Sequence, residues 1–168
     1  MKTRSFIAAL LVAAGLAGCG ASTPTAPDSG SLARVDTLMR SASGALPIAL
    51  KLSSEQIRMG DTLGASVTPG VSGHVYLIQV GTDGRTQSLL FPNAIDGANF
   101  VPAGNTLQLP RPNWRMTARG PAGVGYFVAV LSVQPLDLMA LQASVARGEL
   151  AVPGSYGAAM ATLRETAP

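Results

Sequence analysis

Apolar residues recur at every second position in a series of short runs between Leu46 and Pro135, and Gly or Pro residues separate these runs. A period of two is that of a β-strand, in which successive side chains point to opposite faces of the sheet. The run from His74 to Val80 is apolar on both faces, which is typical of a central strand covered on both sides. About seven such strands at short spacing predict a mainly β fold, an antiparallel β-sandwich or small barrel, rather than a parallel α/β sheet.

A hairpin turn is predicted at Asp83-Gly84, which lies between two of the alternating runs. A two-residue type I′ turn needs positive φ at both central positions, and Asp-Gly is among the pairs that favour it. We therefore expect the strand that ends near Val80 to pair with a returning strand from Thr86 to Phe91.

Helical spacing replaces the period of two on both sides of this region. Apolar residues lie three and four positions apart after Ser31, a candidate N-cap, and again at Leu138, Leu141 and Val145. A last short helix is predicted from Ser155 to Glu165. The expected order along the chain is a short helix over residues 32–45, a β-rich domain over 46–135 and a helical C-terminal extension over 136–168.

Residues 1–18 are typical of a secretory signal peptide. Lys2 and Arg4 precede an apolar run from Phe6 to Ala17, about a dozen residues, which is shorter than the roughly 20 that a transmembrane helix needs. The end of this segment, Leu16-Ala17-Gly18-Cys19, resembles the lipobox of bacterial lipoproteins. That resemblance implies cleavage before Cys19 and acylation of its thiol. The alternative is an ordinary signal peptide followed by an unrelated Cys.

Small and polar residues with two prolines make residues 19–31 a flexible tether. Gly20, directly after the Cys, is permissive for the outer membrane in bacterial lipoproteins. We therefore expect a protein of the bacterial cell envelope, anchored in the outer membrane by acylated Cys19 and facing the periplasm.

Charge and composition exclude several classes of function. The chain has 12 basic and 9 acidic residues, and removing Lys2 and Arg4 with the signal peptide leaves 10 against 9, a net charge of +1. Nucleic-acid binding needs a basic face, and the remaining Arg residues are scattered. One Cys forms no intramolecular disulfide, and one His supplies no multi-histidine metal site. We expect no metal and no cofactor.

The span from about Leu50 to Pro135 resembles the family catalogued as domain of unknown function 4384 (DUF4384). The matching motifs follow one another in the family's order: Arg58-Met59-Gly60-Asp61, Gly73-His74-Val75-Tyr76-Leu77-Ile78-Gln79-Val80, Asp83-Gly84, Leu90-Phe91-Pro92-Asn93, Asn99-Phe100-Val101-Pro102-Ala103-Gly104, Leu107-Gln108-Leu109-Pro110 and Ala118-Arg119-Gly120-Pro121-Ala122-Gly123. The resemblance implies a β-rich domain of exported or multidomain bacterial proteins and no established catalytic activity. Each motif also has a structural explanation, such as an Asp61 carboxylate that caps a turn.

No catalytic residue is predicted. The single His, His74, starts a strand and is expected to be a partly buried structural residue, because no nucleophile elbow accompanies it. Asp83 is explained by its turn and Asp61 by its loop. Asp96 has no evident structural role, so a hydrolase that uses Asp96 or His74 stays open as a third interpretation.

Arg111, Arg115 and Arg119 are the candidate partner-binding residues. A spacing of four places all three on one face of a predicted strand, with Trp114 and Met116 on the other face. Arg side chains can pair with the carboxylates of a partner or with an anionic sugar, whereas the alternative is a solvated strand face. We expect a non-enzymatic module for protein interaction or envelope assembly; a module that binds glycan or peptidoglycan is the alternative.

Overall fold

The computed structural model describes residues 29–168. The predicted signal peptide, the lipidation site Cys19 and most of the predicted tether lie outside the described residues. The helices are α1 (Ser29–Ser41) and α2 (Leu138–Ala146). The strands are β1 (Ile48–Leu52), β2 (Gln56–Arg58), β3 (Thr62–Leu63), β4 (Ala65–Pro69), β5 (Gly73–Val80), β6 (Gln87–Phe91), β7 (Phe100–Val101), β8 (Leu107–Leu109), β9 (Met116–Thr117), β10 (Gly123–Ser132) and β11 (Gly157–Thr166).

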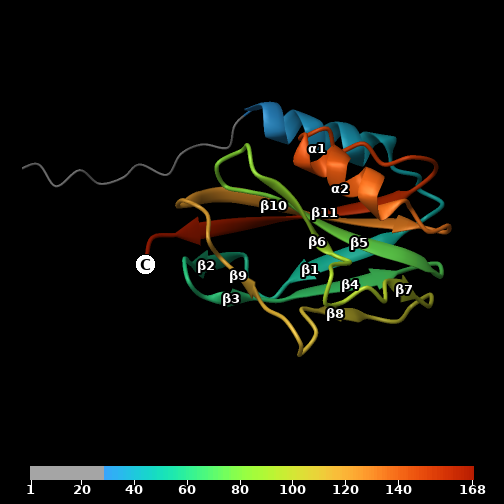
Figure 1. Cartoon of the computed structure of the whole chain (residues 1–168), viewed down its shortest axis with the longest axis horizontal. Helices are drawn as coiled ribbons and strands as arrows, with labels where there is room; N and C mark the ends of the chain where they lie inside the picture. The colour runs from blue at the N-terminus through green and yellow to red at the C-terminus, as the bar shows by residue number, and fades with distance from the viewer. Residues whose placement is uncertain (1–28) are drawn as a thin grey trace, which may run out of the picture.

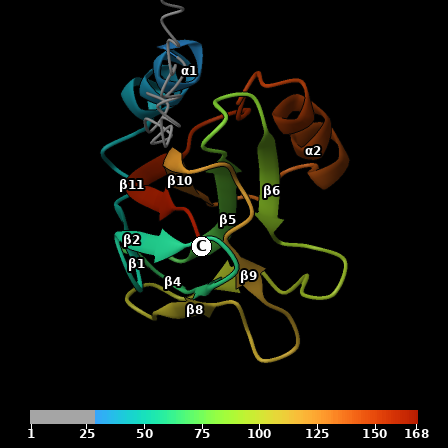
Figure 2. The same ribbon diagram turned by 90° about the vertical axis from the view of Figure 1, so that its left-hand side faces the viewer.

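The strands form a β-sandwich with helices on one outer side (Figure 1). The main sheet has the order β2-β11-β10-β5-β6, and β7 also pairs with β5. A smaller sheet, β1-β4-β8, covers one face of the main sheet, and α1 and α2 cover the other. Figure 2 views these layers from the end at which β11 terminates. The mainly β sandwich predicted from the sequence is confirmed, and its main sheet is open rather than closed into a barrel.

The alternation of apolar residues explains why β5 and β10 occupy the middle of the sandwich. In β5, Val75 and Leu77 pack between the two sheets, whereas Tyr76, Ile78 and Val80 pack beneath the helices. All five side chains are at most 1% exposed. β10 alternates in the same way opposite β5. The prediction of a central strand covered on both sides is therefore confirmed.

The buried positions of the N-terminal helix follow the predicted pattern, but its bounds do not. The helix begins at Ser29 and ends at Ser41, so the predicted N-cap Ser31 and the end of the predicted tether lie inside it and residues 42–45 lie outside it. In α1, Val35 and Leu38 are buried against the main sheet, and Leu32 and Met39 pack at the edge of the same cluster. The Tyr156 hydroxyl donates a hydrogen bond of 2.9 Å to the Leu38 carbonyl oxygen, which joins the end of α1 to the segment before β11. None of the helices in residues 29–168 is long and apolar enough to cross a membrane.

The prediction of a helix from Ser155 to Glu165 is wrong. These residues form most of β11, which lies between β10 and β2 and pairs with β10 from Gly157 opposite Leu131 to Glu165 opposite Gly123. Within the predicted helical extension, only α2 is helical. The Ala-rich sequence favours a helix locally, but helix propensity is weak, and nine paired positions with β10 outweigh it.

The predicted β5–β6 hairpin is present, but its turn is longer than a two-residue type I′ turn. The Gly81 N–H donates to the Thr86 carbonyl across the loop, and Gly84 has φ of 68° whereas Asp83 does not have positive φ. The Asp83 carboxylate accepts hydrogen bonds from the backbone N–H groups of Arg85 and Thr86 and from the Thr86 hydroxyl. These bonds, that of the Thr86 hydroxyl foremost, hold the pKa of Asp83 below its ordinary value. The side-chain bonds of Asp83 thus shape this loop.

Gly157 is a position at which β11 tolerates no side chain. A Cβ there would lie 1.8 Å from the carbonyl oxygen of Leu46, a backbone atom that cannot move away alone. We expect Gly157→Ala to lower the free energy of unfolding by roughly 1–3 kcal/mol, the usual cost of overpacking. Urea denaturation of the purified protein measures this loss.

Gly97→Ala is the matched control, because a Cβ at Gly97 would have no neighbour within 4 Å. This variant is expected to stay within about 0.5 kcal/mol of the unsubstituted protein. Equal stability of the two variants would contradict the close packing of β11 against Leu46.

Candidate binding cavity

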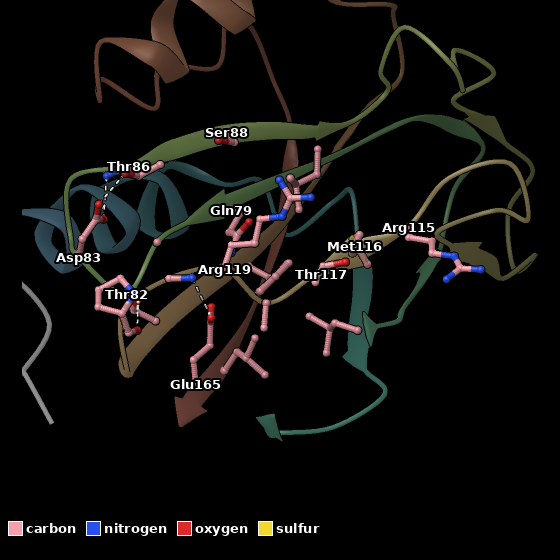
Figure 3. Close-up of a pocket in the computed structure, with 18 of the residues that line it drawn as sticks. Gln79, Thr82, Asp83, Thr86, Ser88, Arg115, Met116, Thr117, Arg119 and Glu165 are labelled. Carbon is pink, nitrogen blue, oxygen red and sulfur yellow. Dashed lines mark hydrogen bonds between the residues drawn. The ribbon is translucent and has the colours of Figure 1, made fainter. Parts of the chain in front are cut away.

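The inner face of the main sheet changes from apolar to polar towards the end shown in Figure 2. Along β5, Leu77 is followed on the same face by Gln79, and along β11, Leu163 is followed by Glu165. Residues 114–121 lie over this end and enclose a cavity of about 540 Å³ (Figure 3). Pockets for small ligands usually measure about 300–1,000 Å³.

The cavity has an apolar floor. Five of the residues that line it are buried side chains from four strands and the segment after β9, and each is at most 6% exposed: Leu63, Met116, Ala118, Phe127 and Leu163. These side chains continue the core between the two sheets. The apolar surface that remains open to a ligand comes mainly from Leu90 and Trp114, which line the cavity and are only half-buried, and a ligand can remove this surface from water.

Five polar side chains of the cavity have no partner in the described part of the chain. Within residues 29–168 they form no hydrogen bond and no ion pair, and they come from β5, β6, β9 and the residues around β9: Gln79, Ser88, Arg115, Thr117 and Arg119. In Figure 3 the Arg119 side chain extends towards the β5–β6 side of the cavity, whereas Arg115 extends away from the other labelled residues. The cavity therefore offers donors and acceptors that the fold itself does not use.

Glu165 is the buried acidic group of the cavity. The residue is only 2% exposed, and its Oε2 atom accepts a hydrogen bond of 3.1 Å from the Gly120 N–H. In residues 29–168 no basic side chain forms an ion pair with it. Burial raises the pKa of the Glu165 carboxyl above its ordinary value of 4.5, and the Gly120 hydrogen bond opposes this shift.

The turn beside Glu165 is held by a second bond. The Thr82 hydroxyl donates a hydrogen bond of 2.7 Å to the carbonyl oxygen of Pro121. A Cβ on Gly120 would lie 2.3 Å from the Thr82 Oγ1 atom, so Gly120 permits this close approach. The 118–121 turn is thus fixed to both the β5–β6 hairpin and β11.

The raised pKa of Glu165 predicts a pH dependence of stability. A carboxyl whose pKa is higher in the folded chain binds its proton more tightly when folded, so the free energy of unfolding falls as the pH rises from the unfolded value, near 4.5, through the folded pKa. Glu165→Gln keeps an acceptor for Gly120 and removes the titration. We expect this variant to gain stability relative to the unsubstituted protein as the pH rises above 4.5, in urea denaturation at a series of pH values. The same gain with Glu55→Gln, which alters an exposed carboxyl, would contradict the assignment to Glu165.

The predicted row of three arginines does not exist as one face of a strand. Only Met116–Thr117 is a strand, β9, and it pairs with β3. Arg111 lies before a turn closed by the hydrogen bond from the Trp114 N–H to the Arg111 carbonyl, and its guanidinium pairs with Asp96. Arg115 and Arg119 line the cavity and Arg111 does not.

Arg111 is part of a structural cluster around Asp96. Its guanidinium forms an ion pair with the buried Asp96 carboxylate and donates to the Ala98 carbonyl oxygen. The other carboxylate oxygen of Asp96 accepts a hydrogen bond of 3.0 Å from the Trp114 indole N–H. Asp96 therefore holds two loops together, which is the structural role that the sequence alone does not reveal.

The predicted structural role is confirmed for His74 and Gly60 and is wrong for Asp61. His74 is half-buried, with Nδ1 3.2 Å from the Asn99 side-chain oxygen and its ring edge-on to Phe100, and it does not line the cavity. Gly60 has φ of 97° in the expected turn, but the exposed Asp61 carboxylate caps no N–H group in the described residues.

Within residues 29–168 no three His, Cys, Asp or Glu side chains gather into a group that could hold a metal ion.

The comparison with protein families agrees with the order of motifs along the strands. Residues 56–135 match the family described as "Domain of unknown function (DUF4384)". Residues 56–135 are a DUF4384 domain. The DUF4384 domain runs from β2 to the loop after β10, so α1, β1, α2 and β11 lie outside the match. The cavity therefore combines residues of the DUF4384 domain with Leu163 and Glu165 of β11, which follows it in sequence.

Other comparisons add little to the DUF4384 match. No curated protein matches the sequence. Among solved structures, the chain is similar to Spo0M, a sporulation control protein from Bacillus subtilis, with a TM-score of 0.41 and 12% sequence identity. That match covers 73% of this chain and 50% of the Spo0M chain.

Proposed function

We propose that this chain is a lipid-anchored protein of the bacterial cell envelope that binds a partner protein and catalyses no reaction. The N-terminal sequence supports the anchor through its signal-peptide pattern and its lipobox-like end at Cys19. The DUF4384 domain and β11 supply the binding surface. The outer membrane, on the periplasmic side, is the proposed location.

The cavity at the end of the main sheet is the observation that carries this proposal. Binding sites usually combine an apolar surface with a few polar groups that fix orientation. The apolar floor and the five polar side chains without partners have this composition. By contrast, the Asp96 carboxylate and the Thr82 hydroxyl are already bonded within the chain.

The arrangement of ionisable residues supports binding rather than catalysis. A nucleophile needs a base within hydrogen-bond reach. His74, the single His of the sequence, bonds to Asn99 outside the cavity. Asp83 is engaged by its own loop and Asp96 by Arg111 and Trp114, so these two acids have structural partners.

A glycan of the envelope is the second candidate ligand. Trp114 lines the cavity together with Arg115 and Arg119, and arginine can pair with the acidic groups of peptidoglycan. Co-sedimentation with purified sacculi tests this candidate, because a glycan-binding module pellets with sacculi and a protein-binding module stays in solution.

Photo-crosslinking in intact cells tests the main proposal. A photoreactive amino acid at Ser88, on the cavity wall, is expected to give one predominant protein adduct. The same residue at Gln142, exposed on α2, is the control and is expected not to give that adduct. The absence of an adduct at Ser88, or the same adduct at both positions, would refute binding through the cavity.

A further inference from the structure

The charges of the cavity are arranged asymmetrically. Arg119, and Arg115 at the rim, are cations that form no ion pair in the described part of the chain. Glu165 lies on β11, whereas in Figure 3 the Arg119 side chain reaches towards Gln79 and Ser88 on β5 and β6. The Asp83 carboxylate, in the β5–β6 loop, also lines the cavity, but it accepts hydrogen bonds from the Arg85 and Thr86 N–H groups and from the Thr86 hydroxyl. A ligand therefore meets the Arg119 guanidinium on the β5–β6 side and the buried Glu165 carboxyl on the β11 side.

This asymmetry selects among ligands. A carboxylate can pair with the guanidinium of Arg119 in two parallel hydrogen bonds, and the neighbouring Gln79 amide and Ser88 hydroxyl can donate as well. Near Glu165 a second carboxylate is disfavoured, whereas an N–H donor can bond to that carboxyl. Between the two lies the apolar floor formed by Phe127, Leu163 and their neighbours.

We propose that the cavity binds the C-terminal end of a partner polypeptide, with the terminal carboxylate on Arg119, an apolar last side chain on the floor and a backbone N–H directed to Glu165. The end of a peptide carries these three groups in this order. The last residue bears both the terminal carboxylate and a side chain, and the peptide bond that joins it to the preceding residue supplies an N–H group. The apolar floor favours a peptide over a sugar chain, which presents mostly hydroxyl groups. This inference rests on the proposed function and specifies the ligand of the same site.

The test uses the full chain, purified in detergent, and peptides coupled to a surface through their N-termini. The peptides end in Leu, Phe or Ser, and each is made with a free carboxylate and with a terminal amide. We expect the free acids that end in Leu or Phe to bind at least about tenfold more tightly than their amides, since hydrogen bonds to charged groups contribute this much. Ser-ending peptides are expected to bind more weakly than the Leu-ending and Phe-ending ones.

Variants of two arginines identify the residue responsible. Arg119→Gln is expected to abolish the preference for the free carboxylate. Arg164→Gln is the matched control, because Arg164 is exposed on β11 and does not line the cavity. Arg164→Gln should leave the preference unchanged.

Three results would overturn the inference: equal binding of acids and amides, no binding of any peptide, or binding of soluble peptidoglycan fragments in the same assay without binding of peptides. These outcomes differ from a failure of the proposed function. If photo-crosslinking in cells gives a protein adduct at Ser88 while none of the peptides binds, the cavity is a binding site for a different part of its partner. If Ser88 gives no adduct, the proposed function itself is refuted.

Discussion

Cys19→Ala is expected to move the protein from the membrane fraction into the soluble periplasmic fraction. Lipoproteins are held by acyl chains, each of which contributes about 0.8 kcal/mol per buried CH₂ group, and two or more chains give stable anchoring. Without the thiol no acyl chain can be attached at this position. Cell fractionation followed by immunoblotting measures the change, which is expected to be nearly complete.

The control for this experiment keeps the thiol and alters its neighbourhood. Ser22→Ala changes a residue of the predicted tether and should leave the protein with the membrane. If Cys19→Ala stays in the membrane fraction as well, acylation of Cys19 is not the anchor. Intact-mass analysis of the unsubstituted protein should show cleavage before Cys19 and the added mass of the lipid.

Ending the chain at Gly154 is expected to prevent folding. This truncation removes β11 from between β10 and β2 in the main sheet. β10 would lose its partner along nine residues, and the core would lose Tyr156 and Leu163, both buried. Burying one such large apolar side chain contributes about 1.5–3 kcal/mol, and the whole domain is expected to be stable by only about 5–15 kcal/mol. Circular dichroism and urea denaturation should show a chain without a cooperative unfolding transition.

A shorter truncation is the control. Removing only Ala167 and Pro168, which are exposed and follow β11, should leave the denaturation midpoint nearly unchanged. A cooperatively folded protein that ends at Gly154 would mean that β11 is dispensable. Such a result would agree with the helical extension predicted from the sequence and contradict the strand.

The parts of the fold that the sequence predicts well are those in which local pattern and tertiary environment agree. The strand from His74 to Val80 is apolar on both faces because helices cover one side and a second sheet the other. α1 shows its buried stripe at Val35 and Leu38 for the same reason. In these elements the period of the apolar residues is set directly by what packs against them.

The segment from Ser155 to Glu165 is the main error because its pattern is weak. Ala is compatible with both helix and strand, and pairing with β10 decides between them. Pairing over residues distant in sequence leaves little local signal. The one local sign of a strand is Gly157, where the backbone of Leu46 approaches closely.

The site could be predicted only in part, because five separate stretches of the chain line it: Leu63, residues 79–90, residues 114–121, Phe127, and Leu163 with Glu165. Two of the three candidate arginines, Arg115 and Arg119, line the cavity, but both lie outside β9, so a four-residue spacing along a strand does not explain their positions. The sequence pattern predicts a helix at Glu165 and therefore does not place this residue beside Gly120. The sequence shows no structural role for Asp96, because its partners Arg111 and Trp114 lie 15 and 18 residues away along the chain.

Thiol protection in the cell tests binding through the cavity most directly. If Cys19 carries lipid, Ser88→Cys introduces the single free thiol of the mature chain. We expect a small maleimide to label this thiol rapidly in the purified protein and slowly in the intact envelope, where the partner covers the cavity. Gln142→Cys on α2 should be labelled at the same rate in both settings. Equal labelling of Ser88→Cys in the purified protein and in the envelope would contradict the account.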